Sequence, residues 1–179
     1  MLERRKIFEE MGITFKLNTS IGDDISIDEL TKNYDAVFMG MGTYNSMQAG
    51  IPGEDSEGVY TALDYLIANV HNCYDFDGPK VDFISLKGKK VVVLGGGDTT
   101  MDCTRTSIRQ QAREVYCAYR RDEANMPGSK KEVVNAKEEG VQFLFNRQPV
   151  EIIAENGSVT GIKLLTTELG EPDERGRRR

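Results

Sequence analysis

Hydrophobic and polar positions along the first part of the chain alternate in a way that predicts four short elements. Apolar residues recur at helical spacing before Gly12, and a strand-like alternation follows that residue. Ser26 and Glu29 have the spacing of a capping box, in which a hydroxyl accepts an orphan backbone N–H at a helix start. The predicted elements are a helix over residues 2–12, a strand over 13–19, a helix from Ser26 to about Tyr34 and a strand over 35–42. They are too few to close a core, so we expect them to belong to a domain that begins earlier.

The pattern after residue 58 is that of an α/β domain with a parallel sheet. Residues 50–58 are rich in structure-breaking residues, which predicts a domain boundary there. Residues 89–94 contain a continuous β-branched run, as expected of a strand buried on both faces. The elements predicted beyond the boundary are an apolar helical stripe over 59–70, a loose stretch over 71–87, strands over 89–94 and 114–119, helices over 100–111 and 130–139, and strands over 141–146, 150–154 and 159–168.

Local signals mark several ends of these elements. Ser129 and Glu132 have capping-box spacing at the start of the second helix, and Asn156-Gly157 is a strong two-residue hairpin turn. Residues 170–179 have the composition of a polar hairpin loop, and we expect their terminal arginines to lie in solvent.

Composition and charge indicate a soluble globular protein. Hydrophobic residues make up 39% of the 179 residues and charged residues 29%, which excludes the disordered class. The net charge of −6 argues against non-specific nucleic-acid binding. The N-terminus has no signal-peptide core and no apolar run approaches the roughly 20 residues that cross a bilayer, so we expect a cytoplasmic protein without a membrane partner. Cys73, Cys103 and Cys117 form no Cys-x-x-Cys pair, and we expect buried, inert thiols.

A glycine turn after the strand over 91–94 is the strongest candidate for chemistry. Gly95 can take the tight turn off the strand, and Gly97 lets the backbone approach a pyrophosphate. The start of the following helix offers an anion unpaired N–H groups and the positive end of the helix dipole. The hydroxyls of Thr99 and Thr100 could donate further hydrogen bonds. Thr100 stands where the Gly-x-Gly-x-x-Gly pattern has Gly or Ala, so we expect looser packing there. With a strand before, a helix after and a second strand beyond, this spacing predicts a dinucleotide-binding unit from Val91 to Arg121.

The second strand ends in Arg120 and Arg121, and these residues decide the expected nucleotide. An NAD site has an acidic residue there that accepts the ribose hydroxyls, and a carboxylate would repel a 2′-phosphate. Guanidinium groups pair with that phosphate through charge-assisted bonds, so the sequence predicts NADPH. Asp122 and Glu123 are expected to orient the arginines or to face solvent.

No nucleophile–base pair and no metal-ligand set is evident, so we expect no catalytic side chain and no metal site. The only histidine, His71, falls in the loose stretch. Three interpretations other than an NADPH-binding electron-transfer module stay open. A self-sufficient dehydrogenase would need a Tyr-x-x-x-Lys motif or a histidine with a substrate domain. A docking or nucleotide-sensing domain would need no catalytic residues. A methyltransferase-type fold would have an acidic residue after the second strand.

Long stretches of the chain resemble the small (β) subunit of NADPH-dependent glutamate synthase. They are Asp35–Tyr44, Gly88–Cys103, Cys117–Gly128 and Gly140–Arg179. Related flavin-dependent reductases share the architecture, among them the electron-input half of dihydropyrimidine dehydrogenase. In this family an FAD domain is interrupted by a Rossmann-like NADPH domain. Electrons pass from NADPH to FAD and through 4Fe-4S clusters to a large subunit, which makes glutamate from glutamine and 2-oxoglutarate.

The resemblance implies a division into residues 1–55, a partial segment of an FAD-binding domain, and 56–179, an NADPH-binding domain truncated at its C-terminus. It implies cofactor contacts from Gly95, Gly96, Gly97, Asp98, Thr99 and Thr100 to the pyrophosphate, from Arg120 and Arg121 to the 2′-phosphate, and from Gly42 and Thr43 to the flavin. The family's FAD fingerprint and cluster cysteines are missing from this sequence. The implied partners are therefore the large subunit and the FAD and iron–sulfur domains of a longer chain. We expect this chain to bind NADPH, to hold FAD only weakly and to show no turnover alone.

Overall fold

The computed structural model of the chain describes residues 2–74, 81–172, 174 and 178. Its backbone contacts divide the chain into two units, Met1–Thr43 and Tyr44–Arg179, each described by itself below. The predicted domain boundary between residues 55 and 56 stays a prediction.

The first unit holds two helices, α1 (Leu2–Glu10) and α2 (Ile27–Asn33). The Ser26 hydroxyl accepts the Glu29 N–H at 3.1 Å, which confirms the predicted cap of α2. The strands predicted over 13–19 and 35–42 are wrong, since neither segment has regular secondary structure. A strand needs a neighbouring strand to satisfy its backbone groups, and no described segment of this unit supplies one. Apolar side chains of the second segment are therefore left in solvent, with Phe38 95% exposed.

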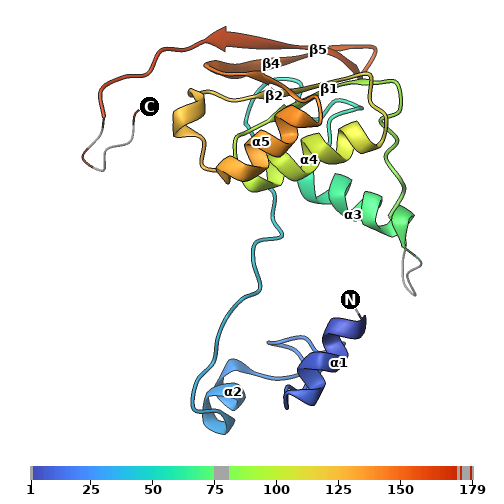
Figure 1. The fold of residues 1–179 in the computed structure, drawn as a ribbon, viewed down its shortest axis with the longest axis vertical. Helices are drawn as coiled ribbons and strands as arrows, with labels where there is room; N and C mark the ends of the chain where they lie inside the picture. The colour runs from blue at the N-terminus through green and yellow to red at the C-terminus, as the bar shows by residue number, and fades with distance from the viewer. Residues whose placement is uncertain (1, 75–80, 173, 175–177, 179) are drawn as a thin grey trace. The chain divides into compact units, whose positions relative to one another are not determined.

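The second unit is an α/β domain with a parallel sheet, as predicted (Figure 1). Its elements are α3 (Ala62–Cys73), β1 (Lys90–Leu94), α4 (Asp98–Arg109), β2 (Glu114–Ala118), the 3₁₀ helix η1 (Glu123–Asn125), α5 (Lys130–Glu138), β3 (Gln142–Leu144), β4 (Arg147–Glu155) and β5 (Ser158–Thr166). Helix α3 extends through His71 to Cys73. The prediction that an irregular stretch begins at residue 71 is therefore wrong for these residues. The polar loop predicted over 170–179 lies partly outside the described residues.

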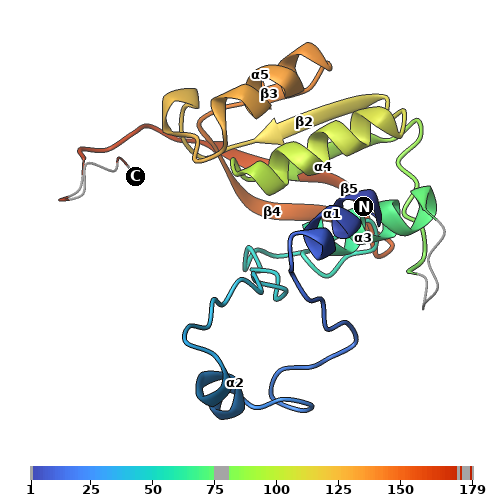
Figure 2. The same ribbon diagram turned by 60° about the horizontal axis from the view of Figure 1, so that its bottom comes forward.

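The sheet has the order β1-β2-β3, and all three strands are parallel. Helix α4 connects β1 to β2, and α5 connects β2 to β3, so two consecutive β-α-β units share the middle strand. Figure 2 shows α4 running alongside β2, against which it packs. The buried core lies between helices and sheet and consists of Met101, Val115, Cys117, Val133, Ala136 and Val141.

An antiparallel hairpin of β4 and β5 completes the second unit. Asn156 and Gly157 both have positive φ, 52° and 86°, which confirms the two-residue turn. The base of the hairpin is bonded to the end of β2, since Arg147 N–H donates to Tyr119 C=O at 2.9 Å. Its outer edge is bonded to residues 52–57, where Ile152 N–H donates to Pro52 C=O at 2.8 Å.

Candidate cofactor-binding site

The parallel register brings the glycine turn and the arginine pair to the same edge of the sheet. Leu94 is paired with Ala118, so the residues that follow each strand leave the sheet side by side. Gly95 N–H donates to Ala118 C=O at 3.0 Å, which fastens the turn to the end of β2. Because crossover helices start at this edge, the carboxyl ends of parallel strands are where α/β proteins bind nucleotides.

The three glycines of the turn have different surroundings. Gly95 has φ of +132°, and a Cβ there would lie 2.6 Å from Thr100 Oγ1. Gly96 is buried, and a Cβ there would lie 2.7 Å from the Tyr119 ring. At Gly97, in contrast, no described residue other than Gly97 and its chain neighbours has an atom within 4 Å of the position that a Cβ would take. The first two glycines therefore serve packing inside the protein, and the third leaves open space in which a ligand can reach the backbone.

Helix α4 begins directly at this open space. Gly97 is its N-cap residue and offers no side-chain oxygen to the first turn, whose leading N–H groups have no partner within a helix. Asp98 and Thr99 are exposed there, whereas Thr100 is 8% exposed. The Thr100 hydroxyl is turned toward Gly95, whose missing side chain makes room for it. The glycine thus accommodates the larger residue that the sequence pattern does not favour at position 100.

Arg121 lies close to the glycine turn, by way of Tyr119. Its guanidinium carbon lies 5.6 Å from the centroid of the Tyr119 ring, and that ring contacts Gly96. Nε of Arg121 is buried and has no hydrogen-bond partner among the residues that the structure describes. A buried donor without an acceptor is rare in folded proteins and indicates a group that an anion can complete.

Arg120 is exposed at the same strand end, and its backbone is held by the hairpin. The Thr167 hydroxyl donates to Arg120 C=O at 2.7 Å, and Asn146 N–H donates to Arg121 C=O at 3.0 Å. The structure therefore brings both arginines to the edge that carries the turn. Contact of either side chain with a cofactor stays a prediction.

The acidic residues after the arginines form other contacts. Asp122 Oδ1 accepts Asn125 N–H at 3.0 Å and so caps η1, and Glu123 pairs with Lys137 at 2.6 Å. Neither contact involves an arginine. These two contacts therefore do not support the prediction that Asp122 and Glu123 orient Arg120 and Arg121.

The segment that leads into α5 lies against the glycine turn, a contact that the sequence does not reveal. Gly128 N–H donates to Gly96 C=O at 3.0 Å, and Ser129 N–H donates to Asp98 Oδ1 at 2.7 Å. Ser129 is the N-cap residue of α5 but makes no side-chain cap bond, so the predicted capping box is wrong in that respect. Glu132 instead forms an ion pair with Arg105. Only the Pro127-Gly128 pair in the sequence hints at such a tight approach.

Gly42 and Thr43 end the first unit and are exposed, outside regular secondary structure. Their predicted place beside a flavin stays a prediction.

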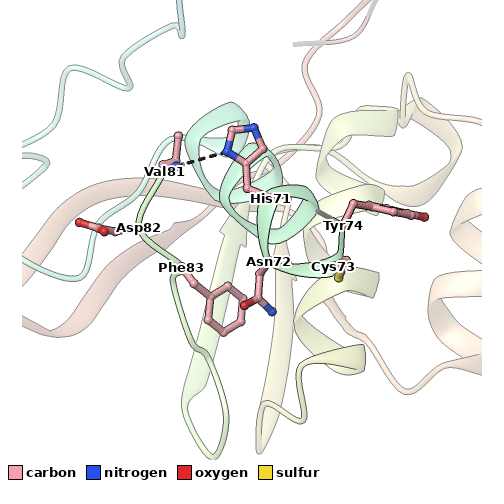
Figure 3. Close-up of a pocket in the computed structure, with 7 residues that line it drawn as sticks. All are labelled: His71, Asn72, Cys73, Tyr74, Val81, Asp82 and Phe83. Carbon is pink, nitrogen blue, oxygen red and sulfur yellow. Dashed lines mark hydrogen bonds between the residues drawn. The ribbon is translucent and has the colours of Figure 1, made fainter. Parts of the chain in front are cut away.

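One cysteine contacts the glycine turn, since the Cys117 thiol donates to Gly95 C=O at 3.4 Å. Burial raises the pKa of the Cys103 and Cys117 thiols to about 12, as expected of inert residues, but Cys73 is exposed, which corrects the prediction that all three are buried. Cys73 and His71 line a hollow of about 400 Å³ between the end of α3 and residues 81–83 (Figure 3). His71 Nδ1 accepts Val81 N–H there at 3.2 Å.

Within the described ranges, no cluster of three or more histidine, cysteine or acidic residues could hold a metal ion, and no helix is long and apolar enough to cross a membrane.

A parallel strand, a glycine turn, a helix start and a basic second strand end together define a dinucleotide-binding domain. The chain belongs to the pyridine nucleotide-disulphide oxidoreductase family, whose model matches residues 21–174.

Two relatives and one solved structure extend this comparison. The chain is 62% identical over 179 residues to the glutamate synthase (NADPH) small chain of Halomonas elongata, which confirms the resemblance found in the sequence. It is 58% identical over 181 residues to the putative oxidoreductase AegA of Escherichia coli. Both alignments cover 100% of this chain, which spans only 38% and 28% of the two relatives. The thioredoxin reductase of Lactococcus lactis has the same fold, with a TM-score of 0.51 and 18% identity over 75% of this chain and 38% of that one.

Proposed function

We propose that this chain is the NADPH-binding electron-input module of a flavin and iron–sulfur oxidoreductase that makes glutamate from glutamine and 2-oxoglutarate. When bound, NADPH would supply the hydride and FAD would accept it. This chain's own residues would bind and orient the nucleotide, because hydride transfer between these two cofactors requires positioning rather than a protein acid. The iron–sulfur clusters and the large subunit would belong to other parts of the assembly.

The open space at Gly97 is the observation that carries the proposal. A pyrophosphate placed there would meet backbone N–H groups at the start of α4 and the positive end of the helix dipole. Thr99 is exposed at the same helix start and offers a hydroxyl. A nucleotide seated in this way would extend its ribose toward the end of the neighbouring strand, as in other folds of this type.

The arginine pair supports NADPH over NADH. Arg121 Nε is a buried donor without an acceptor among the described residues, and Arg120 adds a second cation at the same strand end. No acidic residue takes the position that binds ribose hydroxyls in NAD sites. Free thiols and reduced nucleotide are both features of the cytoplasm, so the proposal includes a cytoplasmic location.

A related oxidoreductase with a different final acceptor is the second candidate. The observation in its favour is that a relative named only as a putative oxidoreductase is nearly as similar as the glutamate synthase chain, at 58% against 62% identity. Both candidates need the same NADPH site. They differ in which substrate oxidises the assembled enzyme.

Calorimetric titration with NADPH, NADH and 2′,5′-ADP tests the proposal. We expect NADPH and 2′,5′-ADP to bind, and NADH to bind about ten- to a hundredfold more weakly, the effect of losing one charge-assisted phosphate contact. Arg120→Ala and Arg121→Ala should bring the affinity for NADPH down toward that for NADH. Arg113→Ala is the matched control, because Arg113 is exposed beside the opposite end of β2. Equal affinity of the unmutated chain for NADPH and NADH would remove the nucleotide assignment.

A second measurement separates electron input from mere docking. The chain is combined with the flavin and iron–sulfur parts of the same protein, and flavin absorbance is followed after NADPH is added. Bleaching of the flavin supports electron input. An unchanged spectrum with NADPH bound would favour a docking or nucleotide-sensing role.

A further inference from the structure

The carboxylate of Asp98 is an unexpected group at an anion site. It stands in the first turn of α4, next to the open space at Gly97, where its negative charge would repel a pyrophosphate. Its Oδ1 accepts Ser129 N–H at 2.7 Å, so the carboxylate is bonded to the residue that precedes α5 rather than turned to a ligand. The family resemblance placed Asp98 among the pyrophosphate contacts, and this bond indicates a different task.

We propose that Asp98 is a positioning residue that fixes the segment 127–129 on the glycine turn and thereby sets the spacing between the two phosphate sites. The proposal rests on the NADPH site inferred above and assigns this residue a role within it. Asp98 belongs to the helix that starts at the pyrophosphate end. Ser129 belongs to the connection that leads from the arginine pair into α5.

The approach of the two segments is close enough to be specific. Gly128 N–H donates to Gly96 C=O at 3.0 Å, and a Cβ on Gly128 would lie 3.0 Å from that same oxygen and 3.3 Å from Asp98 Oδ1. Backbone therefore packs on backbone, and only glycine fits at position 128 without a shift. The Asp98 bond holds the next residue, so the segment is fixed at two consecutive positions.

The other end of the same connection is also fastened. The Tyr119 hydroxyl donates to Asn125 C=O at 2.7 Å, while the Tyr119 ring contacts both Gly96 and Arg121. The connection from β2 to α5 is thus tied to the turn through Tyr119 near its start and through Asp98 near its end. A nucleotide that bridges the turn and the arginines benefits from this rigidity, because a preorganised site loses less freedom on binding.

Three ligands and two substitutions test the role of Asp98 in the 179-residue chain. Asp98→Ala removes both the charge and the acceptor, whereas Asp98→Asn removes the charge and keeps an acceptor oxygen for Ser129 N–H. NADP+ and 2′,5′-ADP can reach both phosphate sites. Adenosine 2′-phosphate can reach only the arginines, so its affinity reports whether the arginine site itself is intact.

We expect Asp98→Ala to weaken binding of NADP+ and 2′,5′-ADP about tenfold and to leave that of adenosine 2′-phosphate within about threefold of the unmutated chain. Asp98→Asn should bind NADP+ at least as well as the unmutated chain, since it loses only the repulsion. Asp102→Ala is the matched control, because the substitution removes the same charge and Asp102 is exposed one turn further along the same face of α4. It should change none of the three affinities by more than about threefold.

Two outcomes would overturn the role. If Asp98→Ala binds NADP+ as tightly as the unmutated chain or more tightly, the carboxylate acts only as a repulsive charge. If it weakens all three ligands alike, the substitution has damaged the domain as a whole.

A readout without ligand separates this role from the nucleotide proposal. Hydrogen exchange of the Ser129 and Gly128 amides should speed up in Asp98→Ala and stay slow in Asp98→Asn. Unchanged exchange in Asp98→Ala would contradict the positioning role even if NADP+ binds. If the unmutated chain does not bind NADP+ but exchange is faster in Asp98→Ala, the NADPH proposal is wrong, and the Asp98 bond still fixes the segment 127–129.

Discussion

At the scale of single residues, neighbouring glycines of the turn are required for different reasons. Gly95 and Gly96 are constrained by Thr100 and by the Tyr119 ring, so their role is in the folded protein itself. In the part of the chain that the structure describes, Gly97 has no such neighbour, so a side chain there would contact a bound ligand before it contacts the protein. Substitutions at adjacent positions should therefore separate folding from binding.

Gly97→Ser should bind nucleotide poorly and yet fold as well as the unmutated chain. Serine is a favoured N-cap residue, so its hydroxyl can satisfy the first turn of α4 and raise stability by a few tenths of a kcal/mol. The same side chain fills the space at residue 97 and occupies a donor, which should weaken binding of 2′,5′-ADP about tenfold or more. Calorimetry and urea unfolding measure the two effects on one sample.

Gly96→Ala is the contrasting variant. Its methyl group would lie 2.7 Å from the buried Tyr119 ring, so we expect a loss of about 1–3 kcal/mol in the free energy of unfolding. A Gly97→Ser protein that binds 2′,5′-ADP normally would show that the pyrophosphate does not approach the turn at that residue.

Contacts between residues far apart in the chain could not be predicted from the sequence. The spacing from Gly95 to Arg121 predicted the turn and the arginines, because those positions follow from a repeating β-α-β geometry. The bond from Asp98 to Ser129 and the contact of Tyr119 with Gly96 join residues more than twenty positions apart. No local pattern encodes such pairs, since they depend on how two connections pack over the same sheet edge.

At the scale of elements, α4 and α5 are held together at both ends. Near their N-termini the Asp98 bond joins them, and near their C-termini Arg105 donates to Glu139 at 2.7 Å. Arg105 also pairs with Glu132, and Arg109 pairs with Glu139 at 3.0 Å. Hydrogen bonding to Arg105 lowers the pKa of Glu139 below its ordinary value, so the carboxylate contributes stability in its ionised form.

Glu139→Gln should therefore lower the free energy of unfolding by about 0.5–1 kcal/mol at neutral pH, a figure that allows for solvent screening. The folded-state pKa is lowered, so this contribution is present above the ordinary carboxyl pKa and is lost as pH falls through the lowered value. The gap between variant and parent should close at acidic pH and shrink in high salt. Urea unfolding across pH measures it.

Glu138→Gln is the control for that series, because Glu138 is the exposed neighbour on the same helix. A gap for Glu139→Gln that stays constant from neutral to acidic pH would mean that the ion pairs contribute nothing and that the substitution acts through packing.

Strands with a neighbouring strand were predicted well, and the two predicted strands without one did not form. The β-branched run over 89–94 formed β1, and the helices before and after β2 formed close to their predicted ranges. Strand β1 is only partly buried, however, so the prediction of a strand buried on both faces is wrong for this structure. Residues 13–19 and 35–42 have equally apolar patterns and remain irregular. Periodicity reports which face would be buried, but a strand forms only where another backbone edge is available.

At the scale of the whole molecule, many of the exposed large apolar side chains belong to the first unit. Phe38 is 95% exposed and Met41 61% in the first unit, whereas Met101 and Cys117 in the core of the second unit are fully buried. Few buried contacts and a solvated backbone give a segment low local stability. The two units should therefore differ strongly in protection, although they belong to one chain.

Hydrogen exchange followed by mass spectrometry should show this difference directly. We expect amides of β1, β2 and α4 to exchange only through global unfolding of the second unit, and those of residues 13–19 and 35–42 to exchange almost at the rate of an unfolded peptide. Addition of NADP+ should slow exchange around the turn at 95–100 and leave the first unit unaffected. The same unprotected segment contains Gly42 and Thr43, so a purified chain should carry nucleotide affinity without stoichiometric flavin. A yellow preparation with slow exchange over residues 35–42 would refute this expectation, because it would mean that these residues already form a flavin site in this chain.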